Sequence, residues 1–199
     1  MAAILEVQSG LKAGCTAPAR ASPDSAQERV QAAVNPLFIL TADTAAGGNA
    51  RRGVPLRPIR PDDVGELSLM YRDSYAESLP QPPERATGWI EALLAGSEGS
   101  HLPDASAVLT GPEGQLTAAI IVTEPAPGSE AGWDAVIAEL FTHPGFRRQG
   151  LADELLNHCL DTLQGQGRTT VAVTVDSGNF AALAFYLSRD FRRLTDDDA

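Results

Sequence analysis

The chain has 199 residues, of which 43% are hydrophobic and 21% charged, so it is long and apolar enough to fold as one domain of ordinary size. Fifteen Lys and Arg residues against 26 Asp and Glu residues give a formal net charge of −11, which argues against a nucleic-acid partner. An acidic protein suits a cationic partner such as an amine. The apolar runs are far shorter than the ~18 residues of a membrane span, and we see no secretory signal, so we expect a cytoplasmic protein without a membrane partner.

The cysteines and histidines do not have the spacing of a metal or disulfide site. Cys15 and Cys159 lie far apart and form no CxxC pair, and His101, His143 and His158 lack the spacing of metal ligands. Cys159 falls on the apolar stripe of a predicted helix, so we expect it in the core. We therefore expect neither a metal nor a cysteine nucleophile.

Residues 1–50 differ in composition from the rest of the chain. They are rich in Ala, Gly, Ser, Pro and Thr, and their apolar residues show weak periodicity, which predicts a poorly ordered N-terminal extension. The apolar run from Asn35 to Leu40 is the exception, because it could form a short strand or a docking segment. The periodic pattern begins at Val54, so residues 54–199 are the predicted domain.

From residue 54 onward, the hydrophobic pattern predicts strands and helices in the order β-α-α-β-β-β-α-β-α-β. Antiparallel strands come first and a strand-helix-strand unit comes later. We therefore expect an α/β (α+β) fold with a mixed, mostly antiparallel central sheet flanked by helices. Strands are expected at residues 54–60, 105–110, 115–123, 134–142 and 169–175 and at Phe191, and helices at 61–74, 82–96, 149–163 and 179–187.

A loop rich in arginine leads into the clearest helix of the chain. Its sequence is Arg147-Arg148-Gln149-Gly150-Leu151-Ala152. A helix N-terminus presents unpaired amide groups and a partial positive charge, so it can hold an anion. The loop has neither the Gly-Lys-Ser/Thr of a P-loop nor a GxGxxG pattern. It fits a pyrophosphate-binding loop, although so short a pattern also fits an ordinary helix start.

A second motif lies in the last predicted helix. Asn179 can cap this helix, and Tyr186 lies two turns further along nearly the same face. Taken alone, Tyr186 is better explained as a buried aromatic residue whose hydroxyl has a hydrogen-bond partner.

Together, the two motifs resemble the GNAT superfamily of acyl-CoA N-acyltransferases. The resemblance runs from about residue 54 to the C-terminus and implies the GNAT-like fold, with acetyl-CoA as co-substrate. It implies that Asn179 contacts the cofactor and that Tyr186 faces the thioester sulfur. It also implies that pyrophosphate binds at Arg147, Arg148, Gln149, Gly150, Leu151 and Ala152, and that the pantetheine arm bonds to the backbone of Leu140, Phe141 and Thr142.

The chain departs from the family pattern at four places, of which Ala152 in place of Gly at the end of the pyrophosphate loop is a change that the family tolerates. The family usually has one more strand after the one at Phe191, but only eight residues follow it here, so the sheet is either truncated or completed by another segment. Asp190 replaces the usual Gly before Phe191. Thr174 stands where a branch that acetylates a ribosomal protein carries a carboxylate, which leaves the acceptor and the general base open.

The resemblance implies an N-acetyltransferase in which an amine attacks the thioester directly. Tyr186 is then expected to assist the departing thiolate, and Glu139 is the first candidate for the base, because a carboxylate within an apolar strand needs a partner or a use. An ion pair between Glu139 and an arginine is the structural alternative. Further candidates for the base are His143, Asp134 and Glu124.

The acceptor stays open at this point. The sequence predicts a primary amine on a small molecule or a peptide, and a homodimer is compatible with it. The rival function is a catalytically silent acyl-CoA-binding module for sensing or assembly, which would need the loop at Gly150 but not Tyr186.

Overall fold

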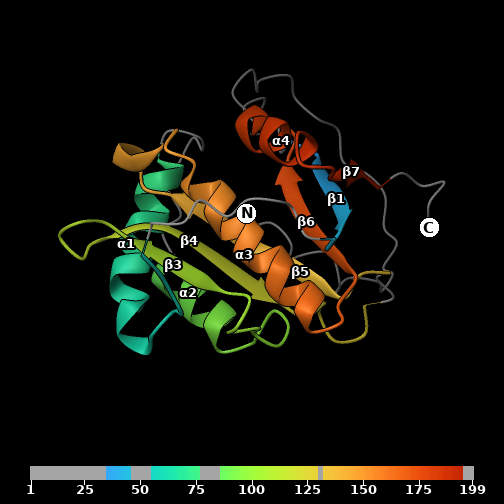
Figure 1. Ribbon diagram of the computed structural model, residues 1–199, viewed down its shortest axis with the longest axis horizontal. Coiled ribbons are helices and arrows are strands. Elements are labelled where there is room, and N and C mark those ends of the chain that lie inside the picture. The colour runs from blue at the N-terminus through green and yellow to red at the C-terminus, as the bar shows by residue number, and fades with distance from the viewer. Residues whose placement is uncertain (1–34, 46–54, 77–85, 130–131, 195–199) are drawn as a thin grey trace, which may run out of the picture.

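The computed structural model describes residues 35–45, 55–76, 86–129 and 132–194, which form a seven-stranded sheet with helices on both faces (Figure 1). The strand order is β2-β3-β4-β5-β6-β1-β7, and β5 and β6 form its parallel pair. The elements are β1 (Leu37–Asp43), β2 (Leu56–Arg57), a 3₁₀ turn (Pro61–Asp63), α1 (Val64–Tyr75), α2 (Ala86–Leu94), β3 (Ala107–Thr110), β4 (Leu116–Thr123), β5 (Ala135–Thr142), a 3₁₀ turn (Pro144–Phe146), α3 (Leu151–Gly165), β6 (Thr170–Asp176), α4 (Phe180–Leu187) and β7 (Arg192–Arg193).

The central strand β4 is buried on both faces and separates two hydrophobic cores. Side chains alternate across a strand, so Ile120 and Val122 pack in the core that contains α3, whereas Ala119 and Ile121 pack in the core that contains α1 and α2. The predicted fold class and the order of elements from residue 54 onward are confirmed. None of the described helices is long and apolar enough to cross a membrane.

Strand β1 corrects the predicted start of the domain. It pairs antiparallel with β6 from Leu37↔Asp176 to Asp43↔Thr170, and on its other side with β7 (Figure 1). Residues 37–43 are therefore part of the sheet and not of an extension, and the alternative of a strand or docking segment at this apolar run is the one observed. The predicted domain boundary at residue 54 is too late, because Leu40 is buried by pairing with β6, which is distant in sequence. The rest of the predicted extension, residues 1–34 and 46–50, lies outside the described residues.

The position of β1 also explains how the sheet is completed. β7 contains two residues, and it reaches the sheet only through β1, opposite Leu40 and Thr41. A segment from the start of the chain thus fills the place between β6 and β7. The sheet is completed by another segment, as one of the two sequence-based alternatives proposed.

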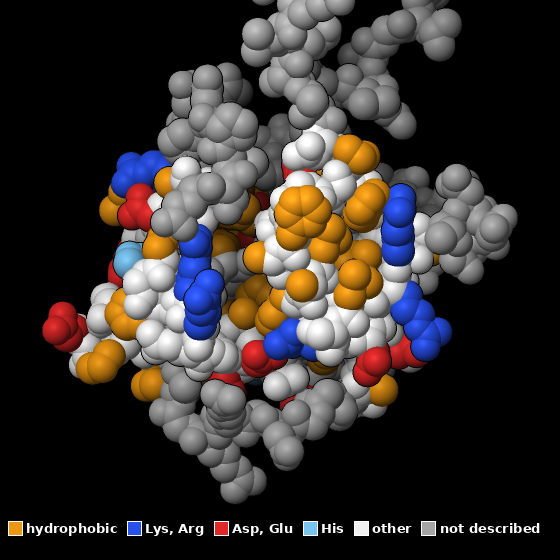
Figure 2. Space-filling model, turned by 90° about the horizontal axis from the view of Figure 1, so that it is seen from above, with side chains coloured by type: hydrophobic (Ala, Val, Ile, Leu, Met, Phe, Trp, Pro, Cys, Tyr) orange, Lys and Arg blue, Asp and Glu red, His pale blue; other side chains and the backbone are white. Residues whose placement is uncertain are grey.

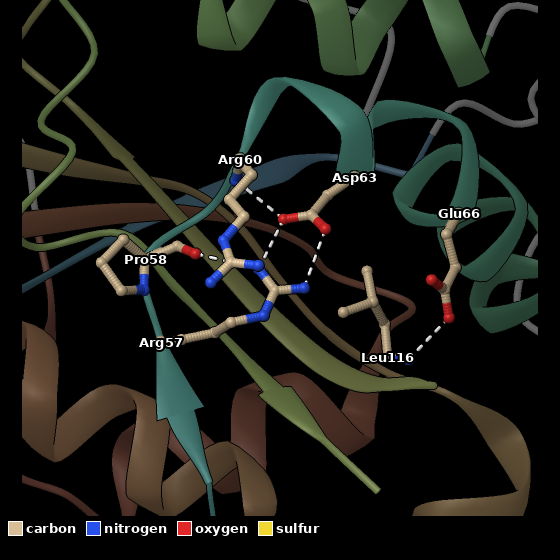
Figure 3. Close-up of polar contacts among 6 residues, drawn as sticks. All are labelled: Arg57, Pro58, Arg60, Asp63, Glu66 and Leu116. Atoms are coloured by element: carbon tan, nitrogen blue, oxygen red, sulfur yellow. Dashed lines mark hydrogen bonds and ion pairs between the residues drawn. The ribbon is translucent and has the colours of Figure 1, made fainter. Parts of the chain in front are cut away.

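Polar contacts tie the start of α1 to the strands beside it (Figure 3). The Arg57 guanidinium donates two hydrogen bonds of 2.7 and 2.8 Å to the Asp63 carboxylate, which also accepts one of 2.7 Å from the Arg60 amide. One turn later, Glu66 accepts a hydrogen bond of 2.6 Å from the Leu116 amide at the start of β4. These contacts hold the helix in place, so that its last turn lies over the end of β5.

Candidate active site

The two parallel strands separate halfway along the sheet. β5 and β6 pair only from Ala135↔Val171 to Ile137↔Val173, and beyond that point β6 continues to pair with β1 alone. Among the described strands, the edge of β5 that faces β6 therefore has no partner from residue 138 onward. Its backbone groups are free to bond an extended ligand.

A cavity of about 420 Å³ opens where the two strands separate. On this face the molecule is hollowed between two lobes, with hydrophobic side chains in the hollow and Lys and Arg side chains along its borders (Figure 2). The cavity is lined by the end of α1, β5, the loop before α3, and α4, through residues Ser74, Tyr75, Leu140, Phe141, Thr142, Phe146, Arg147, Arg148, Gly150, Leu151, Ala152, Asp153, Asn179, Ala181 and Phe185.

The loop before α3 presents a row of backbone N–H groups. Arg148 and Gly150 adopt left-handed φ values of 61° and 80°, which turn the chain sharply into the helix. The first intrahelical bond runs from the Glu154 amide to the Gly150 carbonyl, and within the described residues no hydrogen bond is made by the backbone N–H groups of residues 148–153. Such a row at the positive end of a fifteen-residue helix is suited to binding an anion.

The charged side chains around this loop differ in the hydrogen bonds and ion pairs that they make. Arg148 lines the cavity and makes no ion pair or hydrogen bond within the described part of the chain, so its charge can serve a ligand. The Arg147 guanidinium instead donates a 2.6 Å hydrogen bond to the Ser74 carbonyl in the last turn of α1. Asp153 also lines the cavity, but its charge is offset by an ion pair with Arg189. Gln149 is exposed and not part of the lining, so only its backbone can contribute.

Asn179 and Tyr186 lie at opposite ends of α4. The Asn179 side-chain oxygen caps the helix by accepting a hydrogen bond of 3.1 Å from the Ala182 amide, and its NH₂ group makes no bond within the described residues. Tyr186 is 4% exposed, with its ring centroid 5.0 Å from that of Phe191, and is not among the residues that line the cavity. Burial raises the pKa of Tyr186 far above its usual value, so the hydroxyl keeps its proton at neutral pH.

Glu139 is buried next to the cavity on the face of the sheet that carries α1 and α2. A β-bulge places it there, because Ile121 pairs with Glu139 but Val122 pairs with Ile137, and Ala138 is left over. The carboxylate accepts hydrogen bonds of 2.9 Å from the Tyr75 hydroxyl and 2.8 Å from the Trp89 indole.

The surroundings of Glu139 differ from those of an ordinary structural carboxylate. The alternative of an ion pair with an arginine is wrong for the described part of the chain, where its partners are neutral donors. Burial raises the pKa of Glu139, and the hydrogen bonds from Trp89 and Tyr75 oppose that rise. A carboxyl group with a raised pKa next to a cavity is a candidate for proton transfer.

The other three candidates for the base lie elsewhere. His143 accepts a 3.1 Å hydrogen bond from the Gly145 amide and caps the turn before α3. Glu124 forms an ion pair of 2.7 Å with Arg168, and the Asp134 carboxylate accepts hydrogen bonds from residues 169 and 170 at the start of β6. These contacts lie at the end of the sheet where β5 and β6 are still paired, so they do not bring the two carboxylates to the cavity. Within the described residues, no cluster of three His, Cys, Asp or Glu side chains could hold a metal ion.

Part of the lining escaped the sequence analysis. No role was predicted for Ser74 and Tyr75 at the end of α1, or for Asp153, Ala181 and Phe185, which lie beside or within the two motifs. A helical projection of α4 could have indicated Phe185 and Ala181. The position of Tyr75 at the cavity depends on how α1 crosses the sheet, and a local sequence pattern does not report that crossing.

Comparisons with known proteins agree with this geometry. The sequence profile of the Acetyltransferase (GNAT) family matches residues 66–191. The [ribosomal protein bS18]-alanine N-acetyltransferase of Escherichia coli K12 is 26% identical over 107 residues, and the match spans 54% of this chain and 66% of that enzyme.

Solved structures show the same fold. The crystal structure of the Escherichia coli ribosomal-protein-S18-alanine N-acetyltransferase superposes with a TM-score of 0.55 at 21% identity, covering 72% of this chain and 80% of that one. A GNAT acetyltransferase from Brucella melitensis in complex with acetyl-CoA gives a TM-score of 0.52 at 19% identity, covering 73% and 90%. With the profile matched across most of the described sheet, the chain belongs to the GNAT family of acetyltransferases.

Proposed function

We propose that this protein moves an acetyl group from acetyl-CoA to a primary amine by direct attack. Enzymes of the family use acetyl-CoA, and one observation carries the proposal to this chain: the N–H groups of Arg148 and residues 150–153, which make no hydrogen bond within the described residues, line the same cavity as the unpaired edge of β5. The first can hold a pyrophosphate and the second an amide-containing arm. A long ligand with both groups fits this arrangement.

We assign each part of the cofactor to described residues. The pyrophosphate would bind the backbone of residues 148–153 with Arg148 beside it, and the pantetheine arm would bond the backbone of Leu140, Phe141 and Thr142. The Asn179 amide group would contact the same arm. Arg147 contributes by holding α1 against the loop, since its guanidinium binds the Ser74 carbonyl.

The chemistry requires one base and one acid. The attacking amine must be neutral, and an alkylamine has a pKa near ~10.4 in water, so a base such as Glu139 would take its proton. The C–N bond forms, the C–S bond breaks, and the leaving thiolate of coenzyme A takes a proton. Tyr186 is the proposed donor to that sulfur, because its buried hydroxyl stays protonated.

The remaining question is which amine accepts the acetyl group. The Escherichia coli relative is named for an alanine of a ribosomal protein, which makes the N-terminal amine of a peptide the first acceptor class to test. The match spans 66% of that enzyme, and Thr174 replaces a carboxylate of that branch, so small amines are tested beside it.

An acetylation screen tests the proposal. Polyamines, aminoglycosides, amino acids and peptides with free N-termini are incubated with the full chain and acetyl-CoA, and the release of coenzyme A is measured. We expect release with at least one class, and with peptides first. Binding of acetyl-CoA without release for any class would instead favour the silent binding module.

A further inference from the structure

Tyr75 lies between the cavity and the carboxylate of Glu139. Tyr75 contributes to the cavity lining, whereas Glu139 does not and is 2% exposed. The Tyr75 hydroxyl donates a 2.9 Å hydrogen bond to Oε2 of Glu139. A molecule in the cavity therefore meets the tyrosine before it meets the carboxylate.

The other oxygen of Glu139 is also occupied. Trp89 on α2 donates a 2.8 Å hydrogen bond to Oε1. Among the described residues, the titratable groups that act on Glu139 are Tyr71 and Tyr75 on α1 and Tyr186 on α4, and all three are phenols. Each oxygen thus already accepts one hydrogen bond, and Glu139 is buried while Tyr75 lines the cavity, so an acceptor amine in the cavity meets the tyrosine hydroxyl first.

We propose that Tyr75 is a catalytic residue that relays the proton of the acceptor amine to Glu139. The proposal rests on the proposed function, in which Glu139 is the base. The Tyr75 oxygen accepts a hydrogen bond from the ammonium group while its own O–H donates to Oε2. One proton passes from the nitrogen to the tyrosine oxygen as the tyrosine proton passes to the carboxylate. The amine becomes neutral, Glu139 becomes a carboxylic acid, and Tyr75 ends as a phenol again.

The surroundings favour a concerted transfer through a neutral tyrosine. Burial raises the pKa of Tyr75 well above its usual value, with the charge of Glu139 adding to the rise, so a free tyrosinate is disfavoured. The same burial favours the neutral form of Glu139 that the relay produces. Both effects favour moving the two protons together.

Contacts of the neighbouring residue hold Tyr75 in this position. The Ser74 hydroxyl donates a 3.0 Å hydrogen bond to the Thr142 carbonyl at the end of β5, and Arg147 binds the Ser74 carbonyl at 2.6 Å. The Tyr75 ring packs on Tyr71 with centroids 4.7 Å apart. The hydroxyl is thus fixed by the strand and by the cofactor loop before any acceptor arrives.

The chain offers a matched pair of variants to test the relay. Tyr75→Phe and Trp89→Phe each remove one hydrogen bond from one oxygen of Glu139, but only Tyr75→Phe removes the group that faces the cavity. The kcat, the kcat/KM and the KM for acetyl-CoA are measured against pH with an accepted amine. Near-UV circular dichroism reports whether each variant is folded.

The relay predicts different pH profiles for the two variants. Tyr75→Phe is expected to lower kcat by about 10²-fold or more at every pH, with the KM for acetyl-CoA little changed. Trp89→Phe is expected to move the acid limb of kcat/KM to higher pH, because the carboxylate loses one donor, and to approach the activity of the native chain above that limb.

Glu139→Gln separates the relay from the function on which it rests. If Glu139→Gln and Tyr75→Phe each lose activity and the double variant loses little more, the two act as one unit and the relay is supported. If Glu139→Gln loses activity but Tyr75→Phe behaves like Trp89→Phe, the relay is overturned and Glu139 remains the base. Full activity in Glu139→Gln overturns the base assignment and the relay with it.

Discussion

At the scale of single residues, the proposed acetyl transfer depends on a few polar groups around the point where β5 and β6 separate. Tyr186 on α4 is buried in the core that contains α3, whereas Glu139 on β5 is buried against α1 and α2 on the other face of the sheet. Each has a raised pKa for the same first reason, which is burial. Burial keeps the tyrosine protonated, as the proposed acid requires, and raises the proton affinity of the carboxylate, as the proposed base requires.

Replacing Tyr186 by Phe removes only the hydroxyl. The ring would keep its packing on Phe191, so the fold and the affinity for acetyl-CoA should change little. We expect kcat to fall by about 10²-fold, at the lower end of the effect of a general acid, because a coenzyme A thiol is already a fair leaving group. The measurement is kcat against pH for both forms. An unchanged kcat with chemistry rate-limiting would leave Tyr186 as a core residue only.

At the scale of elements, β1 and α1 hold the parts of the candidate site in position. β1 lies between β6 and β7, and Leu40 in its centre is 1% exposed. The start of α1 is fixed by the ion pair of Asp63 with Arg57, and its end carries Tyr75 to Glu139. Each element thus joins parts of the chain that are distant in sequence.

Leu40→Ala tests the contribution of β1 to stability. Truncating a buried leucine typically costs about 2–5 kcal/mol, and for a domain of this size each kcal/mol lowers Tm by about 2–4 °C. We expect a fall in Tm of roughly 5–15 °C by calorimetry. Leu187→Ala, at a leucine that is 53% exposed, is the control and should change Tm by a degree or two. Equal effects of the two substitutions would mean that β1 is not a structural strand.

Asp63→Asn tests the anchor of α1 through its pH dependence. The hydrogen bonds from Arg57 hold the pKa of Asp63 below its usual value, so the folded state favours the ionised form. The stabilisation is present at neutral pH and is lost as the pH falls through that lowered pKa. Asp63→Asn should therefore be less stable than the native chain at pH 7, and the two should converge in strong acid. Urea unfolding across this range measures the difference, and a gap that is the same at every pH would contradict the ionic anchor.

At the scale of the whole molecule, local patterns were enough to predict the order of elements and the sharp turn that leads into α3. The stripe of leucines on α3 and the glycine before it lie within one stretch, so residues 147–152 could be found without a structure. Asp190 takes the left-handed φ of 61° expected of the family's glycine, which its short polar side chain tolerates.

The features that escaped prediction depend on contacts distant in sequence. The burial of Leu40 needs the edge of β6, and the position of Tyr75 needs the crossing of α1 over β5. Glu139 could be proposed as a base, but its partners on α1 and α2 could not. A single sequence reports periodicity and motifs, and it does not report which distant segments meet.

The central claim is that the start of α3 and the unpaired edge of β5 form the acetyl-CoA site. Titration calorimetry of acetyl-CoA into the full chain, compared with Gly150→Glu and Gly165→Glu, tests it most directly. Gly150 has a φ of 80° within the row of free amides, so glutamate adds strain, bulk and negative charge there, whereas Gly165 faces open space at the other end of the helix. We predict that the native chain and Gly165→Glu both bind. We predict at least a tenfold weaker affinity for Gly150→Glu, which corresponds to a loss of about 1.4 kcal/mol in binding free energy. Equal affinity in all three proteins, or no binding by the native chain, would contradict the account.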